Sequence, residues 1–82
     1  MFDAISQLLS LTDEYERVTG CDRVTVSWRV FGDSKKLAAL HEGKDIQVRR
    51  YEAAVRWLSA NWPDGATWPE RIGRPNLEEV AA

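Results

Sequence analysis

Cysteine and histidine are the side chains most often used for nucleophilic or metal chemistry, and the chain has one of each, Cys21 and His41. A nucleophile–base pair would require both to lie within hydrogen-bond reach of each other. One cysteine and one histidine also cannot complete a four-ligand zinc site without several carboxylates. His41 lies at a predicted helix end, where its ring can simply bond the last carbonyl groups. Because no glycine-rich phosphate loop occurs either, we expect no enzyme activity, no cofactor and no metal site.

The distribution of charge is more informative than the net charge of −2. Residues 23–56 contain eight Lys and Arg against four Asp and Glu, whereas the segments on either side are acidic. A basic segment between acidic ends can form a positive patch for phosphates. The alternative is a set of ordinary solvated helix faces. The candidate phosphate-binding cations are Lys35, Lys36, Arg49 and Arg50.

Hydrophobic periodicity predicts four helices that must position these residues, at 3–19, 23–31, about 35–42 and about 46–61. Their predicted N-caps are Asp3, Asp22, Ser34 and Asp45. Gly20 and Gly43 follow the first and third helices, and Pro63 ends the fourth. Thr12 is an alternative cap that would break the first helix in two. The first helix has an apolar stripe at Ile5, Leu8, Leu9, Thr12, Tyr15 and Val18.

The helix at 23–31 is apolar on two sides, with Val26 and Val30 on one and Val24, Trp28 and Phe31 on the other. Such a helix is either fully buried or presents one side to a partner. Trp28 therefore has three possible roles: a core residue, a subunit contact, or a contact to a thymine methyl in a DNA groove. No segment alternates for long enough to predict a sheet.

Residues 62–75 contain all three prolines and two of the four tryptophans. We expect an extended arm whose indoles lie against the helices, and a frayed helical turn at 76–82. The predicted fold is therefore all-α: one domain with a compact bundle of about four helices at 1–61 and a Trp/Pro-rich arm at 62–82.

A single cysteine fits a reducing cytoplasm. No apolar run approaches the roughly 18 residues needed to cross a bilayer, and the start Met1–Ala4 lacks the basic region of a signal peptide. We expect a cytoplasmic, nucleoid-associated protein.

The stretch at 12–31 resembles the helix–turn–helix of phage- and lac-type repressors. Gly20 matches the turn glycine, Cys21 a small apolar turn position, and Thr25-Val26-Ser27 the Thr-Val-Ser often found on a recognition helix. The chain departs from the motif at Glu16, where a small residue is usual, and at Arg29, where an apolar residue is common. The longer run from Arg29 to Pro63 is similar to small proteins of α-proteobacteria and their mobile elements.

The resemblance implies that Val26 points into the core, that Thr25 and Ser27 reach phosphates, and that Arg23, Val24 and Trp28 face bases. Arg23 is the first candidate for base recognition, since arginine can bond guanine bidentately. Arg29 contacts either phosphate or base. For Arg23 and Arg29 the alternative is a surface ion pair.

These features predict a small sequence-specific regulator that binds double-stranded DNA, a repressor acting as a homodimer on a palindromic site. The alternative is a protein-binding modulator, similar to an antiactivator, that docks on a larger regulator through the two-sided helix at 23–31.

Overall fold

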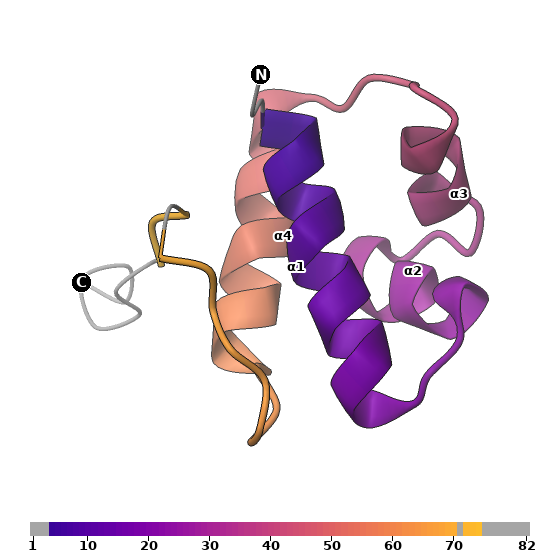
Figure 1. The fold of residues 1–82 in the computed structure, drawn as a ribbon. Helices are drawn as coiled ribbons and strands as arrows, with labels where there is room; N and C mark the ends of the chain where they lie inside the picture. The colour runs from indigo at the N-terminus through magenta and orange to yellow at the C-terminus, as the bar shows by residue number, and fades with distance from the viewer. Residues whose placement is uncertain (1–3, 71, 75–82) are drawn as a thin grey trace.

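The computed structural model describes residues 4–70 and 72–74, and within them it contains four helices and no strand. They are α1 (Ala4–Thr19), α2 (Arg23–Phe31), α3 (Lys36–His41) and α4 (Val48–Ala60). α1 and α4 lie side by side, and α2 and α3 pack against them as a second layer (Figure 1). The prediction of an all-α fold is confirmed. None of these helices is both long and apolar enough to cross a bilayer.

The core between the two layers is built mainly from leucine. Each helix contributes at least one fully buried side chain, and the largest are Leu8, Leu11, Val26, Leu37, Leu40 and Leu58. Full burial of one such side chain stabilises a fold by roughly 1.5–3 kcal/mol. The predicted stripe of α1 is confirmed at Leu8, Thr12 and Tyr15, but it omitted Leu11, which is fully buried.

α1 runs without a break, so the alternative in which Thr12 caps a separate helix is wrong. The hydroxyl of Thr12 is buried and donates to the carbonyl of Leu9 at 3.0 Å, which satisfies it inside the helix. The predicted glycine cap is confirmed: Gly20 has a φ of 73°, and its N–H donates to the carbonyl of Glu16 at 2.9 Å. The predicted Asp3 cap lies outside the described residues.

α2 has the predicted bounds because a cap fixes each end. The carboxylate of Asp22 accepts the N–H of Thr25 at 2.8 Å, as predicted. At the other end Gly32 takes the left-handed conformation with a φ of 69°, and its N–H donates to the carbonyl of Trp28 at 2.8 Å. This glycine turns the chain sharply from α2 toward α3.

The prediction that Ser34 caps α3 is wrong. The carboxylate of Asp33 instead accepts the N–H of Lys35 at 2.9 Å, in the turn before the helix. α3 begins at Lys36 and has no side-chain cap bond.

The prediction that Asp45 caps α4 is also wrong. Its carboxylate accepts the N–H of the next residue, Ile46, at 2.9 Å, and the helix begins only at Val48. Gln47 occupies the N-cap position and makes no side-chain cap bond. The first turn of α4 is therefore left without the carboxylate that would satisfy its free N–H groups.

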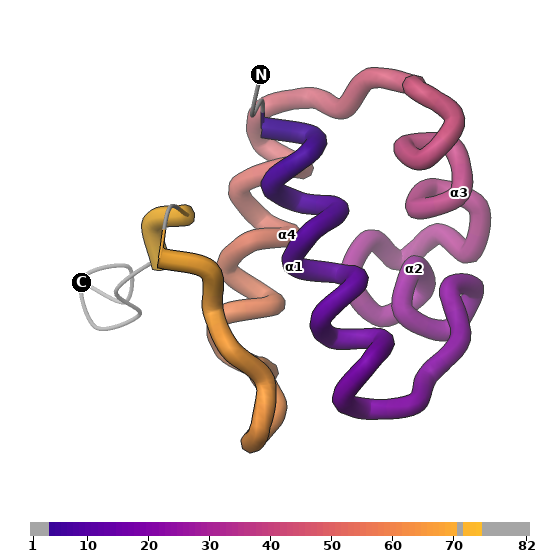
Figure 2. Tube along the Cα trace, in the orientation of Figure 1, coloured from indigo at the N-terminus to yellow at the C-terminus, as the bar shows by residue number. Residues whose placement is uncertain are grey.

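An arm without helix, formed by residues 62–70 and 72–74, runs beside α4 (Figure 2). The rings of Trp62 and Trp68 meet edge to face at 5.0 Å, and both pack against the core. Their Nε1 groups donate to the carbonyls of Ala66 and Ile72 at 3.2 and 2.8 Å. The prediction that the indoles lie against the helices is confirmed for these two, whereas the expected turn at 76–82 lies outside the described residues.

Polar contacts tie the arm to α1. A carboxylate oxygen of Glu14 accepts the N–H of Thr67 at 2.8 Å, and the other accepts Nε of Arg17 at 2.7 Å. The hydrogen bond from Arg17, followed by the one from Thr67, lowers the pKa of Glu14 to about 2. The arm is thus held by a carboxylate that remains ionised well into the acidic range.

The far end of the arm is tied to α4. Arg74 donates to the hydroxyl and the carbonyl of Ser59 at 3.1 and 2.9 Å, and its guanidinium lies over the ring of Trp68 at 5.2 Å. Ile72 is 4% exposed and adds a core residue that was not predicted from the sequence.

Candidate nucleic-acid interface

α2 presents an apolar pair to solvent. Val24 and Trp28 lie one turn apart and are 59% and 63% exposed, whereas Val26 and Val30 on the other side are buried. Of the three roles considered for Trp28, the core role is therefore excluded. Its indole is available to a nucleic acid or to another protein.

The expectation that Ser27 reaches a phosphate is wrong, because its side chain is fully buried. Its hydroxyl donates to the carbonyl of Asp33 and accepts the N–H of Leu37 at 2.9 Å. Ser27 therefore joins α2 to the turn before α3 and to α3 itself, and it has no surface for a ligand.

Thr25 and Arg23 are engaged with acidic groups of this chain. A side-chain hydrogen bond from Thr25 to Asp22, together with the one from the Thr25 backbone, lowers the pKa of Asp22. Burial raises the pKa of Glu16, the charge of Asp13 raises it further, and the positive charge of Arg23 lowers it. Arg23 thus acts electrostatically on Glu16 of α1, whose negative charge would repel a DNA backbone.

Arg29 is exposed but tethered toward α1. Its Nη1 donates to the hydroxyl of Tyr15 at 3.3 Å and to Sγ of Cys21 at 3.4 Å. These contacts leave other N–H groups of the guanidinium unused, so a contact to phosphate or base stays a prediction.

Lys36 and Arg50 are held by backbone carbonyl groups and not by carboxylates. Nζ of Lys36 donates to the carbonyl of Asp45 at 3.0 Å, and Nη2 of Arg50 donates to the carbonyl of Phe31 at 3.2 Å. Within the part of the chain that the structure describes, neither side chain forms an ion pair. A carbonyl orients a cation without neutralising its charge, so both remain available to an anion.

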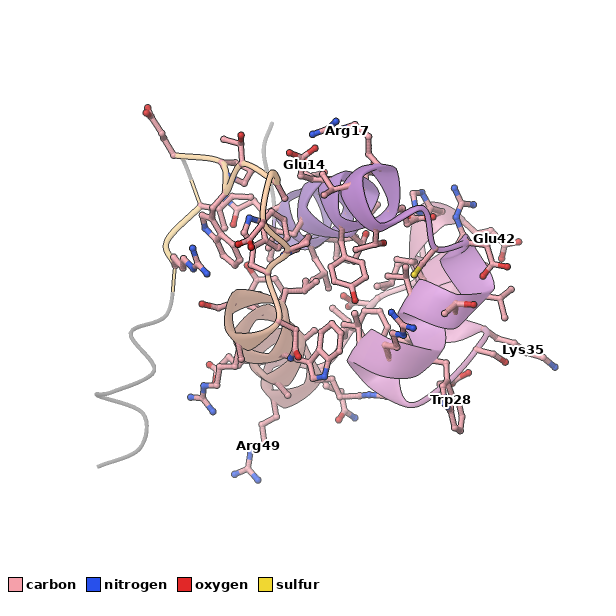
Figure 3. The ribbon with its side chains drawn as sticks, turned by 90° about the horizontal axis from the view of Figure 1, so that it is seen from below. Glu14, Arg17, Trp28, Lys35, Glu42 and Arg49 are labelled. Atoms are coloured by element: carbon pink, nitrogen blue, oxygen red, sulfur yellow. The ribbon has the colours of Figure 1, made fainter. Side chains whose placement is uncertain are left out.

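The other two predicted cations, Lys35 and Arg49, are exposed. Trp28 and Arg49 point to the side of the molecule opposite Glu14 and Arg17, and Lys35 projects outward near Trp28 (Figure 3). Arg50 connects this region to the end of α2 through its bond to Phe31. We use the name cationic face for the set of Trp28, Lys35, Lys36, Arg49 and Arg50.

An open hollow of about 360 Å³ lies where the chain enters α4, lined by Lys36, Asp45, Ile46, Gln47 and Arg50. The two cations were predicted from the sequence, but the other three lining residues were not, since Asp45 was expected to cap the helix and residues 46 and 47 to lie inside it. One signal in the sequence does indicate concentrated positive charge at this place. Arg49 and Arg50 fall in the first turn of the helix, where the helix dipole is itself positive and cations are unfavourable.

Cys21 and His41 have different neighbours. Sγ of Cys21 contacts Arg29, whereas Nε2 of His41 lies 3.8 Å from Oδ1 of Asp13. In the described ranges, no group of three or more His, Cys, Asp or Glu side chains could hold a metal ion. The arrangement offers cations and an exposed indole.

Comparison of the chain with protein-family models, curated proteins and solved structures found no match. The resemblance of residues 12–31 to a helix–turn–helix stays a prediction.

Proposed function

We propose that the protein is a small sequence-specific regulator that binds double-stranded DNA through the cationic face. The observation that carries this proposal is the position of Lys36 and Arg50, two cations that are fixed by carbonyl groups and form no ion pair with the described residues. Fixed, uncompensated cations bind phosphates with little loss of side-chain entropy.

The face combines two kinds of contact that DNA recognition requires. Phosphate contacts position a protein on the duplex, and contacts to base edges supply sequence preference. The cations serve the first role. The exposed indole of Trp28, 63% exposed on α2, can contact thymine methyl groups in the major groove and serve the second.

The protein would act as a repressor in the form of a homodimer on a palindromic site. Two copies related by a two-fold axis would place their α2 helices roughly 34 Å apart, which is one turn of DNA. Analytical ultracentrifugation with and without duplex DNA tests this point. A monomer on DNA at tens of micromolar protein would exclude the dimer.

Fluorescence anisotropy with labelled random duplex DNA tests the cationic face. The double variant Lys35→Gln/Arg49→Gln should weaken binding at least ~10-fold, because two phosphate contacts are lost. Arg17→Gln is the matched control, since Arg17 is exposed on the opposite side (Figure 3). Equal affinity of the double variant and the control would refute the assignment of this face.

A second candidate function is favoured by the exposed apolar pair Val24 and Trp28. The pair could dock on a larger regulator, as an antiactivator does, through an apolar contact between helices. Such a complex should survive 500 mM NaCl, whereas the DNA complex should not. Failure to bind duplex DNA at low salt, together with a salt-resistant protein complex that Trp28→Ala abolishes, would favour this candidate.

A further inference from the structure

Only two of the four predicted phosphate-binding cations line the hollow at the start of α4. Lys36 and Arg50 line it together, although they are 14 positions apart in sequence, whereas Lys35 and Arg49 do not. Each of the two has donors to spare. The ammonium of Lys36 uses one of its three N–H groups on Asp45, and the guanidinium of Arg50 uses one of its five on Phe31.

The wall between these cations is the entry to α4, from Asp45 to Gln47. Gln47 makes no side-chain cap bond and there is no acidic residue in the first turn, so the free N–H groups of that turn add partial positive charge. The opposing charge is Asp45, whose carboxylate accepts the N–H of Ile46. Two cations against one carboxylate leave the hollow with a net positive charge, which favours a small oxyanion.

We propose that this hollow binds one phosphate group, with Lys36 and Arg50 on either side of it and Asp45 limiting its affinity. The site itself follows from the hollow and its charges. That the phosphate belongs to a DNA backbone rests on the proposed function. In that case the bound phosphate would fix the position of α2 on the duplex, since Arg50 is bonded to the last residue of α2, Phe31.

Binding is measured with inorganic phosphate as the probe, added at constant ionic strength and followed by the amide shifts of the ¹⁵N-labelled protein. The amides from Ile46 to Arg50 should shift and saturate. Arg50→Gln and Lys36→Gln should each weaken binding at least ~5-fold, because each removes one charge in direct contact. Lys44→Gln is the matched control. Lys44 is an exposed cation in the loop between α3 and α4, and it does not line the hollow.

Asp45→Asn gives the sharper result because it predicts a gain. The amide oxygen can still accept the N–H of Ile46, while the opposing charge is lost, so phosphate should bind roughly 3- to 10-fold more tightly. A gain in affinity cannot arise from loss of the fold. Glu42→Gln, which removes an exposed carboxylate outside the hollow, should change affinity less than ~2-fold.

The two sources of phosphate are separated by repeating the shift experiment with duplex DNA. If DNA shifts the amides from Ile46 to Arg50 and competes with inorganic phosphate, both the site and its DNA source are supported. If phosphate binds there but DNA does not compete, the site stands as one for a free phosphate, and a DNA backbone is excluded as its source. Shifts spread over the whole surface, or equal effects of Asp45→Asn and Glu42→Gln, would overturn the site.

Discussion

Replacing Ser27 by alanine should destabilise the fold without weakening a ligand contact. The hydroxyl is fully buried and serves two partners, the N–H of Leu37 at 2.9 Å and the carbonyl of Asp33. Loss of the acceptor leaves the Leu37 N–H unsatisfied in the core, at about 1–3 kcal/mol. Loss of the bond to Asp33 adds about 0.5–1.5 kcal/mol, since that carbonyl can regain a water.

The sum, about 1.5–4.5 kcal/mol, is a large fraction of the roughly 4–12 kcal/mol that stabilises a domain of this size. Alanine nearly preserves the volume of serine, so a cavity adds little. Urea denaturation followed by tryptophan fluorescence measures the change, and the melting temperature should fall by at least ~6 °C. DNA affinity, measured where the variant is folded, should stay within ~2-fold.

Ser34→Ala is the matched control, because Ser34 is exposed and does not cap α3. It should cost less than about 0.5 kcal/mol. Equal denaturation midpoints for Ser27→Ala and Ser34→Ala would refute this account of the α2–α3 junction.

Three further predictions test the cap, the arm and the surface of α2. Gly32→Ala should destabilise the protein by about 1 kcal/mol in thermal denaturation, since its φ of 69° is unfavourable for any residue with a side chain, and an unchanged melting temperature would contradict this. Glu14 has a folded pKa of about 2 against an ordinary value of 4.5, so its contribution to stability is complete above pH 4.5 and is lost as the pH falls through 2. The wild type should therefore lose more thermal stability between pH 5 and pH 2 than Glu14→Gln. Parallel curves of melting temperature against pH for the two proteins would show that this carboxylate does not hold the arm. Trp28→Ala should weaken duplex binding while leaving the melting temperature within ~3 °C, because the indole is 63% exposed, and the reverse pattern would indicate a structural role.

The parts of the fold that local sequence determines were predictable. The bounds of α2 follow from Asp22 at one end and Gly32 at the other, and both signals act within four residues of the chain. The end of α1 at Gly20 has the same origin. It was also predictable that Trp62 and Trp68 pack against the helices, since large indoles in a proline-rich arm need apolar surface.

The errors arise where a polar side chain had more than one possible partner. Ser27 matched a motif position on the surface, but its hydroxyl found partners six and ten residues away, at Asp33 and Leu37. Asp45 had the right type for an N-cap, yet it bonds the adjacent Ile46 and leaves α4 to begin later. Such choices depend on how the helices pack, and helical periodicity does not report them.

The candidate site, like the fold, was predictable only in part. The sequence identified the cations, but which of them meet depends on the route of the loop between α3 and α4. That loop brings Lys36 to Arg50, while Arg29 is held toward α1 by its hydrogen bond to Tyr15.

The most direct test of DNA binding by the cationic face is the salt dependence of its affinity for duplex DNA. If Lys36 and Arg50 together neutralise one phosphate and Lys35 and Arg49 neutralise one each, the logarithm of the affinity should fall linearly with the logarithm of the salt concentration, with a slope of about −2.7 per protomer. The affinity should then drop roughly 40-fold per protomer between 50 and 200 mM NaCl. No binding at 50 mM with tens of micromolar protein, or a change below ~2-fold over this range, would contradict the account.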